Sequence, residues 1–338
     1  MIIVLKPGTS IETTKELIAT IEAKGLKPVM LEGTQRNVIA VIGDERALQS
    51  INFESHPDIE KATPVLTPYK LVSREIYPAN TVIDVGGVAV GGNNFVVIAG
   101  PCSVESYAQM TETAAAVREA GARLLRGGVF KPRSSPYAFQ GLGVDGLGIL
   151  SQVSREQSMP AFTEVMEVKD LDMVEEQGAA FQIGARNMKN TRLLTAVGQR
   201  KTPVLLKRGM AATIDDLLLA AEYILCEGNP NVILCERGIS TFETSTRNTL
   251  DLNAIPVLKE KTHLPVIVDP SHGIGVRRWV TPMALAAAAA GADGIMVEVH
   301  NSPKDALSDG HQSLHPDEFV ALMKALRPVV AAVGRELV

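Results

Sequence analysis

Seven basic side chains lie at or just beyond the ends of short apolar runs in the sequence. They are Arg126, Lys131, Arg133, Arg186, Lys207, Arg208 and Arg237. Arginine offers a rigid bidentate fork and lysine a compact charge, so both suit phosphate and carboxylate groups. One such residue alone is as readily explained by a surface salt bridge, here with acids such as Glu164 or Glu236. Seven of them in a chain with a net charge of −5 predict a site for a strongly anionic ligand.

A second set of residues has the chemistry of metal ligands. Cys102, His272, Glu298 and Asp309 supply a thiol, an imidazole and two carboxylates, which suit a divalent metal ion such as Mn²⁺, Fe²⁺, Co²⁺ or Zn²⁺. Their spacing along the chain is no metal signature, so this prediction depends on a fold that brings them together. Taken singly, Cys102 is as readily a small buried hydrophobe, and Asp309, in a Ser-Asp-Gly sequence, is as readily a turn residue.

The fold expected for most of the chain is a (β/α)8 TIM barrel, of the α/β class. Eight short apolar runs alternate with segments of helical length, at 95–100, 122–128, 160–165, 180–186, 203–209, 231–238, 264–273 and 293–300. The carboxyl ends of all eight strands meet at one rim, where barrel active sites lie. The metal set follows the first, seventh and eighth strands, which are neighbours in a closed barrel. An open doubly wound sheet is the alternative, but no GxGxxG turn follows the first strand.

The first 68 residues have a different pattern. Strands are expected at 2–5, 28–31, 37–42 and 62–66, with helices at 11–24 and 45–51. This βαββαβ order predicts a small α+β domain of the ferredoxin-like type. Residues 69–94 are expected to form a linker and a β-hairpin, and residues 95–338 the barrel.

The composition excludes several classes of protein. Hydrophobic residues make up 46% and charged residues 21%, as in soluble globular proteins and unlike disordered chains. The mild acidity gives no electrostatic reason to bind nucleic acid or an anionic membrane, and the longest apolar run, 283–292, is half the ~20 residues that span a bilayer. The N-terminus lacks the features of a signal peptide. We therefore expect a cytoplasmic protein with neither a nucleic-acid nor a membrane partner.

Six short motifs follow the strands of the predicted barrel. LRGGVFKPRSSPY occupies 125–137, and the others are AGPCS at 99–103, IGARN at 183–187, LKRG at 206–209, CERG at 235–238 and DPSH at 269–272. Together they resemble the signature of the 3-deoxy-7-phosphoheptulonate (DAHP) synthases. The similarity covers the whole chain and resembles the short branch of that family, which carries a ferredoxin-like regulatory domain. The family condenses phosphoenolpyruvate with erythrose 4-phosphate, the first step of aromatic amino-acid (shikimate) biosynthesis.

The resemblance implies a role for most of these residues. It implies a divalent metal ion held by Cys102, His272, Glu298 and Asp309. It implies phosphoenolpyruvate contacts at Arg126, Lys131, Gly184, Ala185, Arg186, Lys207 and Arg237, with Glu164 beside them. The erythrose 4-phosphate contacts fall on Arg133 and on Ser134, which keeps the hydroxyl of the family's more common Thr. The residues expected to act in catalysis are Lys131, His272 and Cys102, and Lys131 or a metal-bound water near His272 is the candidate for proton transfer.

Other activities remain as alternatives. The related 3-deoxy-octulosonate-8-phosphate synthases usually have an Asn-Arg pair after Lys-Ala, whereas this chain has Lys131-Pro132-Arg133, which favours the four-carbon sugar phosphate. A metal-dependent aldolase acting on a sugar phosphate would release no inorganic phosphate. A Schiff-base aldolase would use Lys207 without the metal set. A barrel that has lost catalysis is disfavoured because every position carried over from the family is chemically intact.

The N-terminal domain is expected to regulate the barrel. By resemblance, it senses an aromatic amino acid, with Tyr or Phe as the expected feedback inhibitor. In the alternative, the domain only covers a barrel face or holds subunits together. A homo-oligomer is expected, with a tetramer favoured.

Overall fold

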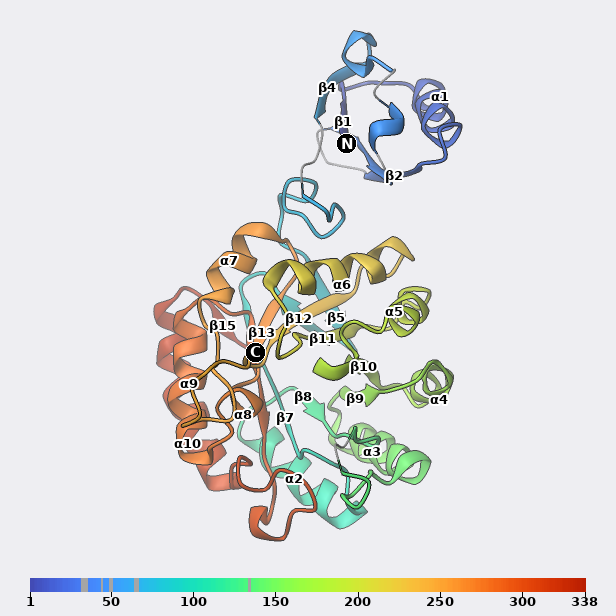
Figure 1. Cartoon of the computed structure of the whole chain (residues 1–338). Coiled ribbons are helices and arrows are strands. Elements are labelled where there is room, and N and C mark those ends of the chain that lie inside the picture. The colour runs from blue at the N-terminus through green and yellow to red at the C-terminus, as the bar shows by residue number, and fades with distance from the viewer. Residues whose placement is uncertain (32–35, 44, 49–50, 64–66, 133–134) are drawn as a thin grey trace. The chain divides into compact units, whose positions relative to one another are not determined.

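The computed structural model describes residues 1–31, 36–43, 45–48, 51–63, 67–132 and 135–338 (Figure 1). The chain divides into two compact units, Met1–Pro78 and Ala79–Val338. The segment 69–78, expected to be part of a linker, falls in the first unit, and its Tyr69 and Val72 are buried. The boundaries 1–68, 69–94 and 95–338 stay predictions.

The first unit confirms the predicted ferredoxin-like α+β domain. Its antiparallel sheet contains β1 (Ile2–Leu5), β2 (Lys27–Leu31), β3 (Val38–Ile42) and β4 (Ile59–Thr63), in the order β2-β3-β1-β4. Helix α1 (Ile11–Glu22) begins where Ser10 Oγ accepts a hydrogen bond from the backbone N–H of Thr13. Its Leu17 and Ile21 are buried in the core of this unit. One helix packed on one sheet face therefore forms a small hydrophobic core.

Two elements of this unit differ from the prediction. A helix was expected at 45–51, but the structure has the short 3₁₀ turns η1 (Glu45–Leu48) and η2 (Phe53–Ser55), and residues 49–50 lie outside the described part. The last strand begins before the expected 62–66, because Ile59 is buried in the core and pairs with Leu5. Residues 64–66 lie outside the described part as well.

The second unit confirms the predicted eight-stranded parallel barrel. Its strands are β7 (Asn94–Gly100), β8 (Leu124–Arg126), β9 (Ala161–Val165), β10 (Ala180–Ile183), β11 (Val204–Lys207), β12 (Val232–Glu236), β13 (Val266–Val268) and β14 (Gly294–Glu298). They pair in chain order, and β14 pairs with β7 to close the ring. Every residue of these strands except Asn94 is buried. Burial on both faces is why parallel strands appear in the sequence as continuous apolar runs.

Helices surround these strands (Figure 1). They are α2 (Tyr107–Glu119), α3 (Gly143–Gln157), α4 (Leu171–Glu176), α5 (Thr191–Gly198), α6 (Ile214–Cys226), α7 (Ala254–Lys261), α8 (Pro270–Ile274), α9 (Arg277–Ala289) and α10 (Pro316–Ala332), with the 3₁₀ turns η3 (Val168–Asp170), η4 (Ala185–Asn187) and η5 (Pro303–Asp305). Side chains fix some helix starts, such as the capping box of Thr213 and Asp216 at α6. In the described ranges, no helix is long and apolar enough to cross a membrane.

A hairpin and the chain's last strand close the amino-terminal end of the barrel. The hairpin consists of β5 (Val82–Val85) and β6 (Val88–Gly91), and its Ile83, Val85 and Val90 are buried in the barrel's inner core. The last strand, β15 (Glu336–Leu337), pairs with β7, and Val338 packs against the same core. The opposite rim, at the carboxyl ends of the strands, is therefore the end that positions the site.

Candidate active site

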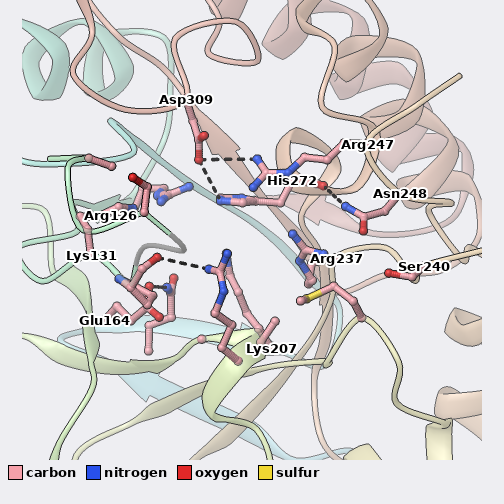
Figure 2. Close-up of a pocket in the computed structure, with 18 residues that line it drawn as sticks. Arg126, Lys131, Glu164, Lys207, Arg237, Ser240, Arg247, Asn248, His272 and Asp309 are labelled. Atoms are coloured by element: carbon pink, nitrogen blue, oxygen red, sulfur yellow. Dashed lines mark hydrogen bonds and ion pairs between the residues drawn. The ribbon is translucent and has the colours of Figure 1, made fainter. Parts of the chain in front are cut away.

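A cavity of about 480 Å³ lies at the carboxyl ends of the barrel strands (Figure 2). Successive strands contribute to its wall. Arg126 ends β8, Glu164 lies in β9, Gln182 lies in β10, Lys207 ends β11 and Arg237 follows β12. The cavity is thus in the place where barrel enzymes bind their substrates.

The four predicted metal ligands meet beside this cavity. One ligand atom each from Cys102, His272, Glu298 and Asp309 lies within 4.8 Å of the others. Cys102 follows β7, Glu298 ends β14, His272 lies on α8 and Asp309 lies on the loop before α10. The Cys102 Sγ is 3.4 Å from the Asp309 Oδ2, and the His272 Nε2 is 3.4 Å from the Glu298 Oε1. Closure of the barrel between β7 and β14 brings together residues that are far apart in the chain.

Asp269 orients the imidazole of His272. Its Oδ1 accepts the backbone N–H of His272 at 2.9 Å as the cap of α8, and its Oδ2 lies 2.7 Å from the His272 Nδ1. Because a carboxylate only accepts, Nδ1 carries the proton and Nε2 presents its lone pair to the cluster. Burial lowers the pKa of His272, and the nearby carboxylates of Asp269 and Glu298 only partly offset this effect. The ring is therefore neutral near pH 7, as a metal ligand must be.

The charges of the cluster fit a divalent metal ion that accepts sulfur as well as oxygen and nitrogen ligands. Burial raises the pKa of Cys102 to about 12, and Glu298 adds to this shift. Burial also raises the pKa of Asp309, but His272 and Arg247 outweigh it and hold the value at about 2. Burial likewise raises the pKa of Glu298, but His272 and Arg126 outweigh it and lower the value, so both carboxylates are ionised near neutral pH. A thiol, an imidazole and two carboxylates form a ligand set suited to such an ion, so the cluster is a candidate metal site.

Five of the predicted cations share the cavity wall, namely Arg126, Lys131, Arg186, Lys207 and Arg237. The Lys207 Nζ is 2.6 Å from the Asp269 Oδ2, and the Arg126 Nη1 is 3.0 Å from the Glu298 Oε1. The Nε of Arg126 is buried without a hydrogen-bond partner. Among the described residues, buried Arg237 makes no ion pair, and it donates to the Gly238 carbonyl at 3.5 Å. Buried positive charge without a full set of partners indicates an anionic ligand.

Glu164 lies against the backbone that follows β10. Its Oε2 accepts a hydrogen bond from the Gln182 Nε2 at 3.4 Å, and a Cβ at position 184 would lie 1.9 Å from its Oε1. A larger residue at position 184 would therefore displace the Glu164 carboxylate from this place. Gly184 and Ala185 both line the cavity. The carboxylate of Glu164 supplies a negative charge inside an otherwise basic wall.

Some residues singled out in the sequence do not line the cavity. Arg208 and Glu236 form a buried ion pair of 2.8 Å, which supports the loop after β12. The predicted contacts at 133 and 134 lie outside the described residues, although their neighbours Pro132 and Ser135 both line the cavity.

Three side chains that shape the site were missed in the sequence. Asp269 bonds both Lys207 and His272, whereas Arg247 and Asn248 line the cavity from the loop after β12. The available signal for Asp269 was its position three residues before His272, where a helix cap is expected. Arg247 and Asn248 gave no signal, because they lie on an irregular loop between β12 and α7.

The fold and the cavity define a class, a barrel enzyme that binds anionic substrates beside a candidate metal site. The DAHP synthetase I family model matches residues 75–333, and the DAHP synthase ferredoxin-like domain model matches residues 1–67. The chain belongs to the DAHP synthetase I family, in the form that carries the ferredoxin-like domain.

Individual relatives agree with this assignment. A phospho-2-dehydro-3-deoxyheptonate aldolase of Thermotoga maritima is 48% identical over 334 residues, which cover 99% of both chains. A 2-dehydro-3-deoxyphosphooctonate aldolase of Syntrophobacter fumaroxidans is more distant, with 34% identity over 72% of this chain and 90% of its own length.

Solved structures agree as well. The crystal structure of the Thermotoga maritima DAHP synthase covers 100% of this chain and 99% of its own, with a TM-score of 0.80 and 47% identity. A truncated form of the 3-deoxy-D-arabino-heptulosonate 7-phosphate synthase from Thermotoga maritima covers 80% of this chain and 99% of its own, with a TM-score of 0.75 and 46% identity.

Proposed function

We propose that this chain condenses phosphoenolpyruvate with erythrose 4-phosphate in the rim cavity, forming 3-deoxy-7-phosphoheptulonate and inorganic phosphate. DAHP synthase activity is the activity of its family, and it is the first step of the shikimate pathway. The observation that carries the proposal is the meeting of a Cys/His/Glu/Asp cluster with a wall of cations at one rim. One half of the site suits an aldehyde, and the other half suits two anionic groups.

The metal ligands of this proposal are Cys102, His272, Glu298 and Asp309, with Mn²⁺, Fe²⁺, Co²⁺ or Zn²⁺ as the ion. Such an ion supplies Lewis acidity, which polarises the aldehyde carbonyl. Metal binding requires the thiolate form of Cys102. The Lys131 ammonium lies 3.1 Å from the Cys102 Sγ, where its charge favours that form.

Phosphoenolpyruvate would lie against the basic wall. It carries a carboxylate and a phosphate on one carbon atom, so it needs several cations close together. Arg186, Lys207 and Arg237, which follow or end the neighbouring strands β10, β11 and β12, meet this need. The unpartnered Nε of Arg126 is one more donor for an anion, and the backbone at Gly184 and Ala185 lines the same space.

Erythrose 4-phosphate would bind beyond these groups, with its phosphate at Arg133 and Ser134. Support comes from the residues on either side of them in the chain, since Pro132 and Ser135 both line the cavity. The aldehyde end of the sugar would then point toward the metal cluster.

The reaction needs one new carbon–carbon bond, one proton donor and one water. The C3 atom of phosphoenolpyruvate bonds to the aldehyde carbon, whose oxygen takes up a proton. Water adds at C2 and loses one proton, and its second proton passes to the departing phosphate as the C–O bond breaks to leave the ketone. Burial lowers the pKa of Lys131, but Cys102 and Glu164 more than offset this, so its pKa lies above the ordinary value. Lys131 therefore carries a proton near neutral pH, and either Lys131 or a water near His272 is the proposed group for the proton transfers.

The N-terminal domain is proposed to bind Tyr or Phe and inhibit the barrel, in a homo-oligomer for which a tetramer is favoured. Support comes from the match of residues 1–67 to the family's ferredoxin-like domain and from the division of the chain after Pro78. A truncated form of a related enzyme, matching 80% of this chain, has a solved structure. A chain of residues 79–338 should therefore fold, keep its activity and lose inhibition by Tyr or Phe. If none of the aromatic amino acids inhibits the intact enzyme at millimolar concentration, the proposal that the N-terminal domain binds such an inhibitor is wrong.

One assay tests the central proposal. The purified full chain is given phosphoenolpyruvate and a panel of aldose phosphates of four and five carbons, with and without a chelator, and released phosphate is measured. We expect phosphate release with erythrose 4-phosphate that stops on chelation and returns with added divalent metal. Preference for arabinose 5-phosphate would instead support the phosphooctonate reaction, and consumption of substrate without phosphate release would support a simple aldolase.

A further inference from the structure

We propose that Arg247 and Gln312 form a relay that orients the carboxylates of Glu298 and Asp309 and thereby sets the metal affinity of the cluster. The inference rests on the metal site of the proposed function and adds two positioning residues to it. Neither Arg247 nor Gln312 supplies a ligand atom to the cluster.

Gln312 holds the side of Glu298 that faces away from the cluster. Its Nε2 donates to the Glu298 Oε2 at 2.6 Å, and the Gln312 side chain is fully buried. The other oxygen of Glu298, Oε1, lies 3.4 Å from the His272 Nε2 and 3.0 Å from the Arg126 Nη1. With Oε2 held, the carboxylate cannot rotate, and Oε1 stays directed toward the imidazole.

Arg247 fixes the orientation of the Gln312 amide. Its Nη1 donates to the Gln312 Oε1 at 2.8 Å and lies 3.6 Å from the Asp309 Oδ2. Figure 2 shows Arg247 and His272 converging on the same carboxylate of Asp309. Arginine has only donors, so it must meet the amide oxygen, and the amide NH₂ is then directed to Glu298. Without Arg247 the amide is free to turn its oxygen toward the carboxylate, which would repel it.

The backbone of the loop after β12 holds Arg247 in this place. The Arg247 N–H donates to the Ile274 carbonyl at 3.1 Å, and the Asn248 Nδ2 donates to the His272 carbonyl at 3.0 Å. A Cβ at Gly275, whose φ is +70°, would lie 2.3 Å from the Arg247 Cβ, so only glycine allows this contact. The loop is thus attached to the helix that carries His272. Through Arg247 and Gln312 it also reaches the two carboxylates of the cluster.

Metal affinity of the stripped protein, without substrates, tests the relay. We would remove metal with a chelator and measure Zn²⁺ and Co²⁺ affinity by competition with a chromophoric chelator. Arg247→Lys keeps the charge, but its nitrogen lies one atom nearer the backbone than the Nη1 that contacts both Gln312 and Asp309, so it cannot take the place of that donor. Gln312→Met keeps the size and the neutral charge but loses both amide groups. Loss of a partner that orients a metal ligand typically weakens binding 10- to 100-fold, and we expect that range for each variant.

Matched controls separate a local effect from a general one. Gln199→Met removes a similar amide–carboxylate bond on the surface, between Gln199 and Glu227, and Arg278→Lys changes an arginine that packs over Trp279. Both controls should bind metal like the unchanged protein. Circular dichroism and thermal unfolding of the stripped proteins verify the fold, and Arg247→Lys, which changes a partly exposed side chain, carries the test if Gln312→Met does not fold.

The outcomes distinguish the relay from the metal site beneath it. If the two residues act in series, the fold-loss of metal affinity in the double variant is smaller than the product of the two single fold-losses. The reason is that the second substitution removes a contact that the first has already made ineffective. The relay is overturned if both variants bind metal as tightly as the unchanged protein, or if Arg247→Lys and Gln312→Met affect the affinity independently. In either case the metal site itself stands, provided that His272→Ala abolishes metal binding. If His272→Ala binds metal normally, the metal site itself is wrong.

Discussion

Replacing Asp269 by asparagine removes one negative charge from the centre of the active-site wall. This carboxylate is fully buried, and its Oδ2 lies 2.6 Å from the Lys207 Nζ and 2.7 Å from the His272 Nδ1. Both partners are donors, so an amide oxygen can accept from them but carries no charge to balance Lys207, and the amide NH₂ would face the backbone N–H of His272, which Oδ1 now accepts. Asp269→Asn therefore leaves Lys207 without its counter-charge and His272 without a firm orientation.

The expected losses follow from this geometry. Breaking a buried ion pair costs about 3–5 kcal/mol, and each kcal/mol moves the melting temperature of a domain this large by about 2–4 °C. The apparent melting temperature should therefore fall by roughly 6–20 °C. Metal affinity should weaken about 10- to 100-fold, because His272 loses the partner that orients it.

The pH dependence has a definite sign. Burial raises the pKa of Asp269, but His272 and Lys207 outweigh it and hold the value well below the ordinary range. A group with a lowered pKa stabilises the fold fully above its unfolded pKa, here ~3.9, and loses that contribution as the pH falls toward the folded value. The contribution of the Asp269 titration to the stability difference between the unchanged protein and Asp269→Asn should thus be constant from neutral pH to about pH 5 and shrink below about pH 4.

Asp293 provides the matched control. It is equally buried and bonded to Lys259 and Arg335, but it lies at the start of β14, at the opposite end of the barrel. Thermal unfolding, chelator competition and KM for phosphoenolpyruvate are measured for both Asp→Asn variants. Asp293→Asn should lose stability while keeping metal affinity and KM. The reasoning fails if Asp269→Asn keeps both, or if the two variants alter them equally.

Other expectations concern the metal thiolate and the two anion sites. Metal binding by the stripped protein should release a proton from Cys102, because burial raises the pKa of this thiol to about 12. Metal affinity should therefore rise with pH, and the same pH dependence of metal affinity in Cys102→Ser would contradict this. Peroxide should inactivate the enzyme with loss of metal, and thiols should restore it; treated enzyme that keeps its metal and rate would refute this. Arg186→Ala should raise KM for phosphoenolpyruvate, and Arg133→Ala should raise it for erythrose 4-phosphate, by about 10- to 150-fold. Equal effects on both substrates would mean that the sites are not distinct.

The barrel was predictable because its strands have a simple local cause. Buried parallel strands need apolar residues on both faces, so runs such as 95–100 and 203–209 stand out against the helices between them. Strand order then followed from closure, and closure placed Cys102 next to Glu298. The candidate metal set could thus be collected from strand ends alone, without knowledge of any side-chain direction.

The contacts around the cluster had no such local cause. Arg247 and Gln312 lie on irregular loops, and their bond of 2.8 Å joins residues 65 positions apart. Lys207 is the last residue of β11 and Arg208 is the next residue, so both lie near the rim. Consecutive side chains of an extended chain nevertheless point to opposite faces. Lys207 therefore faces the cavity, whereas Arg208 pairs with Glu236. Periodicity along the chain predicts which residues are near the rim, but the partner of each depends on the path of the loops.

The last strand also constrains how the chain is made. β7, the first strand of the barrel, pairs with β14 and with β15, which follow it by about 200 residues or more in the chain. At about 5–20 residues per second, a ribosome needs roughly 10–50 s to add the chain between β7 and β15. During that time β7 has an unpaired edge, and such an edge readily joins strands of other chains. Slow translation or a stalled ribosome should therefore favour aggregation through β7, even though the finished barrel has no such free edge there.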